Sequence, residues 1–231
     1  MGKPMNKPLR FMACLIMIFL LQGCIEEDKS NWISENDCDL PCWNGMIVGI
    51  TTQDELLPII NRILILDQNR IILDGHAWEF FSGTSYFRYK ERDINGVVYY
   101  INKIIENLTF SGELDTTFGD MVELVGVPDY IIVIPLLLPT TSLEVTAIYT
   151  TLGISYSYNT HTLPKRMRDQ IGPDIPINYV MIFDPKIFDE LIDASLFGQG
   201  YYNGEETRKS LRPWDGFGVL LEKYPAAKKQ N

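Results

Sequence analysis

A segment of ten residues occurs twice in this chain, and this repeat limits the folds that the chain can adopt. The segment "TTQDELLPII" aligns with "TTFGDMVELV", which begins sixty-five residues later. In each copy a threonine precedes an acid by three residues, Thr52 with Glu55 and Thr117 with Asp120, which is the pattern of an N-terminal capping box. Apolar residues follow with helical spacing. The repeat therefore predicts two equivalent amphipathic helices.

Segments with β-strand character follow each of these helices. The stretches "SYFRYKERDI" and "VVYYINKIIENLTF" flank Asn95-Gly96, a strong hairpin signal. The run "YIIVIPLLLP" is shorter than the about 20 residues of a membrane-spanning helix, so it predicts a buried strand ended by prolines. "LEVTAIYT" with "GISYSYN" predicts another hairpin, and "INYVMIF" a further strand. Helix-then-strands units of this kind predict an α+β fold, an antiparallel sheet with helices packed on one face.

We expect a single α+β domain whose C-terminal part adds a strand, a helix and a tail. The expected boundaries are 37–231 for the domain, about 45–110 and 111–160 for the two repeat units, and 175–231 for the C-terminal part. Asp184 can cap the third helix, and Pro185 suits its first position. Trp214 and Phe217 in the tail could dock back onto the body of the domain.

The N-terminal residues have the pattern of an export signal. The basic, acid-free start "MGKPMNKPLR" precedes the apolar run "FMACLIMIFLL". The next residues, Leu21-Gln22-Gly23-Cys24, resemble the lipobox of bacterial lipoproteins, in which the cysteine receives a lipid and type II signal peptidase cleaves before it. The resemblance implies a signal peptide at 1–23, acyl chains such as palmitate on Cys24, and an extracytoplasmic protein on the cell membrane or outer membrane. The polar residues 24–36 would form a tether. An ordinary signal peptide with an accidental cysteine is the alternative.

The cysteine count agrees with that assignment. One of the four cysteines would leave with the signal and lipidation would use Cys24, so that Cys38 and Cys42 remain as one pair. Disulfides persist in exported proteins, and a small Cys38–Cys42 loop is the simplest outcome. A structural zinc site needs about four ligands, and His76 and His161 are far away in the sequence. The spacing also differs from the Cys-x-x-Cys of redox motifs.

The charge of the chain disfavours nucleic acid as a partner. Without the three basic residues of 1–23, the chain keeps 17 basic against 30 acidic residues, a net charge of −13. Nucleic-acid affinity depends on Lys and Arg that neutralise phosphates. A body this acidic is also disfavoured at an anionic lipid surface, so that the lipid on Cys24 would be its contact with the membrane.

Two short motifs carry a second resemblance. Gly49-Ile50-Thr51 precedes the first predicted helix, and Gly126-Val127-Pro128 follows the second. This arrangement resembles the small lipoproteins of the BamE/SmpA outer-membrane assembly type and the related β-lactamase-inhibitor-protein fold. The resemblance covers about thirty residues in two pieces. It implies a helix-and-sheet repeat and, by analogy, an inhibitor-like protein as one functional alternative.

The sequence contains no recognisable catalytic motif. There is no Gly-x-Ser-x-Gly elbow, no calcium-binding loop and no phosphate-binding Gly-x-x-x-x-Gly-Lys. We therefore predict no catalytic residue, cofactor or metal. The 30 acids leave one enzymatic alternative open, an extracytoplasmic carboxylate-dependent hydrolase acting on glycan or peptide, which requires two carboxyls in a deep cleft and a raised pKa.

Aromatic residues offer the best candidates for a binding surface. Trp78, Tyr86, Tyr89 and Tyr99 lie in the first sheet region, and rings of this kind supply rigid contact area. Core packing would use the same residues and is the preferred interpretation for any single one. The same two interpretations apply to a later cluster, which comprises Tyr156, Tyr158, Tyr201 and Tyr202. The sequence thus predicts a membrane-anchored, non-enzymatic binding module. Its expected partner is an envelope protein, which the sequence does not identify.

Overall fold

The structure, a computed structural model, describes residues 38–63, 72–75, 83–88, 94–136, 142–194, 196–198 and 202–227, with 72–75 and 83–88 described as backbone only. The chain separates into two units, Met1–Asn31 and Trp32–Asn231, and every described residue belongs to the second. The predicted signal peptide, the tether with Cys24, Trp78 and Tyr89 lie outside the described residues.

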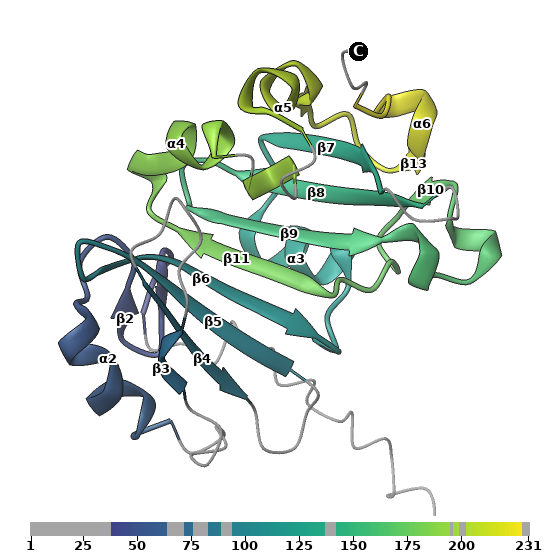
Figure 1. Ribbon diagram of the computed structural model, residues 1–231. Coiled ribbons are helices and arrows are strands. Elements are labelled where there is room, and N and C mark those ends of the chain that lie inside the picture. The colour runs from purple at the N-terminus through teal and green to yellow at the C-terminus, as the bar shows by residue number, and fades with distance from the viewer. Residues whose placement is uncertain are drawn as a thin grey trace, which may run out of the picture. The chain divides into compact units, whose positions relative to one another are not determined.

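A nine-stranded antiparallel sheet forms the centre of the second unit (Figure 1). Its strand order is β12-β7-β8-β9-β11-β6-β5-β4-β3. The strands are β3 (Ile72–Gly75), β4 (Gly83–Arg88), β5 (Ile94–Ile101), β6 (Ile104–Gly112), β7 (Tyr130–Pro135), β8 (Leu143–Tyr149), β9 (Ile154–Asn159), β11 (Tyr179–Phe183) and β12 (Arg212–Pro213). Two small pairs accompany it, β1 (Cys42–Trp43) with β2 (Met46–Ile47), and β10 (Gln170–Ile171) with β13 (Gly218–Val219). The predicted α+β fold with an antiparallel sheet is confirmed.

The two repeat helices form as predicted, each with a capping box. In α2 (Gln53–Ile60) the backbone N–H of Thr52 donates to Glu55 Oε2 over 2.9 Å. In α3 (Phe118–Val125) the backbone N–H of Thr117 donates to Asp120 Oδ2 over 2.8 Å, and Thr117 Oγ1 accepts from the backbone N–H of Asp120. These bonds satisfy donors that a helix N-terminus leaves without partners.

The two repeat units are joined through β11. Strands β3 to β6 follow α2, and strands β7 to β9 follow α3. Strand β11 comes later in the chain and lies between β9 and β6, antiparallel to both. The sheet is therefore continuous only because this late strand pairs with both units.

The predicted turn at Asn95-Gly96 is wrong. Both residues lie within β5, and the chain reverses instead at Asn102 and Lys103, whose positive φ angles of 50° and 68° suit a tight hairpin. Gly96 pairs with Phe110 of the neighbouring strand. A residue without a side chain at this position leaves room for the large ring across the strand pair.

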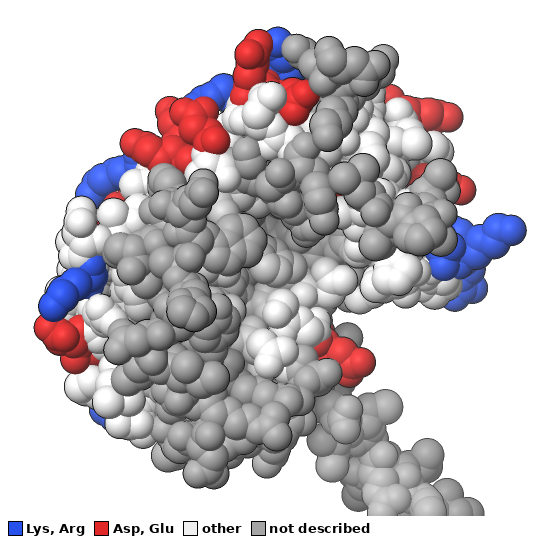
Figure 2. All heavy atoms as spheres, viewed as in Figure 1, with Lys and Arg blue, Asp and Glu red and all other residues white. Residues whose placement is uncertain are grey.

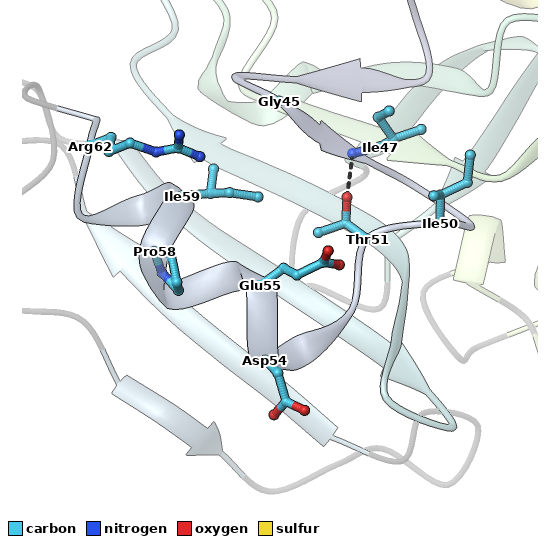
Figure 3. A pocket seen from close by; sticks show the side chains of 9 residues that line it. All are labelled: Gly45, Ile47, Ile50, Thr51, Asp54, Glu55, Pro58, Ile59 and Arg62. Atoms are coloured by element: carbon cyan, nitrogen blue, oxygen red, sulfur yellow. Dashed lines mark hydrogen bonds between the residues drawn. The ribbon is translucent and has the colours of Figure 1, made fainter.

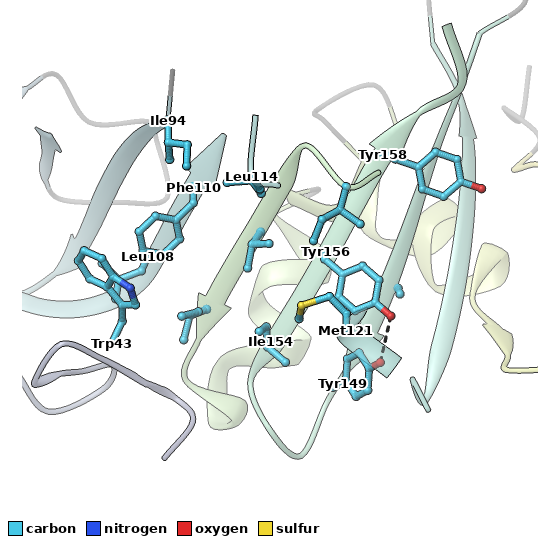
Figure 4. Packing of buried hydrophobic residues seen from close by; sticks show 14 of the residues in the cluster. Trp43, Ile94, Leu108, Phe110, Leu114, Met121, Tyr149, Ile154, Tyr156 and Tyr158 are labelled. Carbon is cyan, nitrogen blue, oxygen red and sulfur yellow. Dashed lines mark hydrogen bonds between the residues drawn. The ribbon is translucent and has the colours of Figure 1, made fainter. Parts of the chain in front are cut away.

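One face of the sheet, the first face, packs against α2 and α3. Alternate side chains of the strands point to it, and the rings of Trp43 and Phe110 meet here with centroids 4.8 Å apart (Figure 4). From the helices, Leu56 and Met121 join this core at 0% exposure. Tyr149 donates a hydrogen bond to Gly126 O over 2.7 Å, which fixes the end of α3 to the sheet.

The C-terminal tail also packs on the first face, as expected. Trp214 stacks on Phe118 with ring centroids 5.8 Å apart, and Phe217 meets Phe118 edge-on at the same separation. Helix α6 (Leu220–Lys223) follows, and the hydroxyl of Tyr224 accepts the backbone N–H of Asp215.

The opposite face of the sheet, the second face, is covered at one end by the C-terminal helices. Asp184 caps the short helix η4 (Pro185–Ile187), as predicted, and α4 (Phe188–Asp193) continues from it. Leu191 and Ile192 of α4 pack with Phe183 in a second apolar cluster. Helix α5 (Gly204–Ser210) is linked to α4 by Arg208. The two repeat helices share one face, as predicted. The third predicted helix, α4, packs with α5 on the opposite face, whereas from the sequence we expected helices on one face only.

Candidate functional site

The second face changes from apolar to polar along the sheet. At the α4 end it presents Ile132, Ile134 and Ile148, which pack with η5 (Leu196–Gly198) and α4. Figure 1 shows α3 behind β9 and β11, so this face is turned toward the viewer. Beyond the apolar end, the alternate positions of β8, β9 and β6 carry small polar side chains.

These side chains form what we call the polar strip, which comprises Asn107, Thr109, Thr146, Ser155 and Ser157. The strand register makes the strip continuous. Thr146 pairs with Ser157 across β8 and β9, and Met181 of β11 pairs with both Ser155 and Thr109. All five members are buried, at 1–5% exposure. A buried sheet face normally carries apolar residues, so its composition here is unusual.

Two atoms of the strip lack hydrogen-bond partners. Asn107 Oδ1 and Ser155 Oγ are buried and have none in the structure, although Asn107 Nδ2 donates to Met181 Sδ over 2.9 Å. A buried polar atom without a partner costs about 1–3 kcal/mol. Native proteins retain few such atoms, and a bound water or ligand is a common reason for them.

Two tyrosines flank the strip. Tyr179 lies on β11 and Tyr99 on β5, and both are half-buried on the second face. Burial of the Tyr179 hydroxyl raises its pKa above the usual range, the nearby Tyr99 and Glu144 raise it further, and a hydrogen bond with Thr109 opposes the shift. Tyr179 therefore stays protonated and can both donate and accept a hydrogen bond.

Four aromatic residues were predicted as candidates for a binding surface. Tyr99 is the one among them whose side chain lies in the described part of the chain. Its neighbour Tyr100 points to the opposite face and is 1% exposed in the core. Tyr86 lies on β4, paired with Val97, and its side chain is outside the described part of the chain. Of the later cluster, Tyr156 and Tyr158 lie in the first-face core at 0% exposure, as the core-packing interpretation predicted.

The described Lys, Arg, Asp and Glu side chains that are visible in Figure 2 lie mainly at the margins of the view. Glu144 is a buried acid on β8, 8% exposed, on the same face as Thr146 two positions further along. The polar strip itself is uncharged.

A pair of carboxylates lies elsewhere, at the start of β6 and the end of β11. The backbone N–H of Asp184 donates to Glu106 O over 3.3 Å, and burial together with the charge of Asp184 raises the pKa of the Glu106 carboxyl, while Lys186 opposes the shift. Gly49 lies against this pair, since a Cβ there would be 2.4 Å from Asp184 Oδ2. These contacts fill the space beside the Asp184 carboxylate.

A shallow groove lies between α2 and the β1–β2 hairpin (Figure 3). Its volume is about 430 Å³, and its lining includes Ile47, Ile50, Glu55 and Arg62. Ile50 is 67% exposed, and Glu55 is engaged in the capping box of α2. The groove thus offers exposed apolar surface and contains neither member of the Glu106–Asp184 pair.

The remaining predicted residues have structural positions. Cys38 and Cys42 form the predicted disulfide, with Cα atoms 5.8 Å apart. His161 lies in the exposed turn η2 (Thr160–Thr162), and His76 is outside the described residues. Within the described ranges, no three His, Cys, Asp or Glu residues are grouped as metal ligands. No helix in those ranges has the length and apolarity needed to cross a membrane.

Comparison of the chain with models of protein families, with curated proteins and with solved structures finds no match.

Proposed function

We propose that this chain is a lipid-anchored extracytoplasmic protein whose domain binds an envelope component through the second face of its sheet. Residues 1–23 would act as the signal peptide and Cys24 would carry the lipid. The observation that carries the binding role is the polar strip, in which Ser155 and Asn107 hold buried polar atoms without partners. Stability alone favours apolar residues at such positions, and stability is often sacrificed where a site must bind.

The anchor is tested by the intact mass of the protein extracted from membranes. We expect the mass of residues 24–231 plus a diacylglycerol, with a further acyl chain where the amino terminus is acylated. A Cys24→Ala variant should lose the lipid and the membrane association. An unlipidated product of the unaltered chain would contradict the anchor and leave the binding role to be judged separately.

The binding role is tested by photocrosslinking in membranes that contain the full chain. A photoreactive phenylalanine analogue replaces Tyr99 on the second face or, as the control, Glu123, an exposed residue of α3. We expect a defined adduct from position 99 and none of the same mass from position 123. Identical patterns from the two positions would contradict a binding function for this face.

A second candidate function, a carboxylate-dependent hydrolase, draws on the Glu106–Asp184 pair, which supplies an acid with a raised pKa but lies outside the groove and has the space beside Asp184 filled. In this proposal Glu106 would donate a proton to the leaving group of a glycan or peptide. A Glu106→Gln variant that kept its fold but lost hydrolysis of peptidoglycan fragments would support it. Equal turnover by both proteins, or by neither, would count against it.

A further inference from the structure

The chemistry of the polar strip narrows the kind of ligand. Serine and threonine hydroxyls both donate and accept hydrogen bonds, and so does the amide of asparagine. Ser155 Oγ and Asn107 Oδ1 are buried with no partner in the structure, and both belong to strands whose other side packs in the core. A ligand at this face would therefore meet groups prepared for hydrogen bonds rather than for apolar contact.

The charge of the polar strip also limits the kind of ligand that it can bind. None of its five members is ionisable, and the buried Glu144 on the same face is close enough to raise the pKa of Tyr179. An anionic ligand placed on the strip would lose hydration without gaining a counter-ion there, and Glu144 would repel it. The strip is thus unsuited to an anionic ligand.

The length of the polar strip favours an extended ligand built from several linked units. It runs across the strands from Thr146 on β8, over β9 and β11, to Thr109 on β6, and Tyr99 continues it on β5. Four strand intervals correspond to about 19 Å. Tyr179 and Tyr99 supply ring surfaces with hydroxyl tips along this line, which suits a ligand with alternating apolar and polar parts.

We infer that the polar strip with Tyr179 and Tyr99 binds a neutral oligosaccharide. The inference rests on the proposed binding function and names its ligand class. Sugar hydroxyls would satisfy Ser155 Oγ and Asn107 Oδ1, and sugar ring faces would lie on the tyrosines. The strip members are at most 5% exposed, so the side chains that cover them must move as the ligand enters. Met181, which is 3% exposed and accepts from Asn107 Nδ2, is one of these. An unbranched methionine side chain can make that movement.

The test uses the full chain in a detergent without a sugar headgroup. Binding of chitotetraose, which is neutral, is measured by calorimetry and compared with binding of tetragalacturonate, which is anionic. Ser155→Ala removes an unpartnered hydroxyl, so we expect it to raise the melting temperature of the protein without oligosaccharide by about 2–4 °C. The same variant should weaken chitotetraose binding at least tenfold.

Ser210→Ala is the matched control. Ser210 is also buried, at 5% exposure, but its hydroxyl donates to Glu206 O over 2.8 Å. This variant should lower the melting temperature and leave chitotetraose binding unchanged. The opposite signs of the two temperature shifts separate an unpartnered hydroxyl from one that the fold itself uses.

Three results would overturn the inference. A lowered melting temperature in Ser155→Ala would show that the fold, through a buried water for example, already satisfies this hydroxyl. Tetragalacturonate that binds as tightly as chitotetraose would refute the neutral class. Absence of chitotetraose binding, or equal binding by the variant, would refute the oligosaccharide, while a specific crosslink from position 99 would still support the broader binding function.

Discussion

Truncation of Phe118 to alanine should destabilise the domain strongly, because this ring joins three parts of the structure. Phe118 is 0% exposed at the start of α3, meets Tyr156 of the sheet edge-on at 4.8 Å, and stacks on Trp214 of the tail. Removal of a buried phenylalanine ring costs about 3–5 kcal/mol. A domain of this size has a total stability of about 5–15 kcal/mol, so the loss is a large fraction of it.

Urea denaturation and thermal denaturation of the full chain, both monitored by far-ultraviolet circular dichroism, measure that loss. The expected shift in melting temperature is about 6–20 °C downward. Trp214 fluorescence should change in the folded variant as well, since its stacking partner is gone. Phe118→Leu retains much of the volume and should cost less, which provides a folded variant if the alanine variant does not accumulate.

Leu124→Ala on the same helix is the control. Leu124 is 41% exposed, and exposed positions of this kind usually change stability by less than about 0.5 kcal/mol. If Phe118→Ala and Leu124→Ala cost the same, the assignment of Phe118 to the centre of the first-face core would be refuted.

Three further predictions concern charge, the disulfide and the helix caps. The raised pKa of Glu106 means that the folded state binds its proton more tightly than the unfolded state, so stability should fall as pH rises through the interval above the ordinary glutamate pKa of 4.5. Glu106→Gln should flatten that fall in urea titrations between pH 4 and pH 7, roughly the range in which carboxyl groups titrate, and an unchanged slope would contradict the assignment. Cys38→Ser should lower stability by about 2 kcal/mol, since the Cys38–Cys42 loop is short, and it should do so only under oxidising conditions. Thr117→Ala and Thr52→Ala should each cost about 1 kcal/mol, measured as shifts in urea midpoint, and no effect at either site would count against the equivalence of the two capping boxes.

The elements with strong local signals were predictable from the sequence. The capping boxes of Thr52 and Thr117 predicted where both helices begin. The alternation of tyrosine and serine in "GISYSYN" predicted a strand with its tyrosines on one side. The same alternation places Ser155 and Ser157 on the other side. Local pattern normally predicts that such a polar side is solvated, so the burial of these serines could not be read from it.

Other features depended on contacts between distant residues. Asn95-Gly96 has the composition of a hairpin turn, but the neighbouring strand containing Phe110 extends β5 through it. The position of β11 between β9 and β6 involves no local signal, because a strand pairs with whichever edges the rest of the chain leaves available. The Asp184 carboxylate meets Gly49 for the same reason, through tertiary packing between residues far apart in the chain.

The place of β11 in the sheet has a consequence for how the protein is made. A chain that emerges N-terminus first presents β6 and β9 before Tyr179–Phe183 can join them, so each exposes an unpaired strand edge during that interval. Closure of the sheet waits for contacts between residues far apart in the chain, which slows folding. A product truncated before β11 would keep both open edges, and we expect it to aggregate or to be degraded rather than to persist as half a domain.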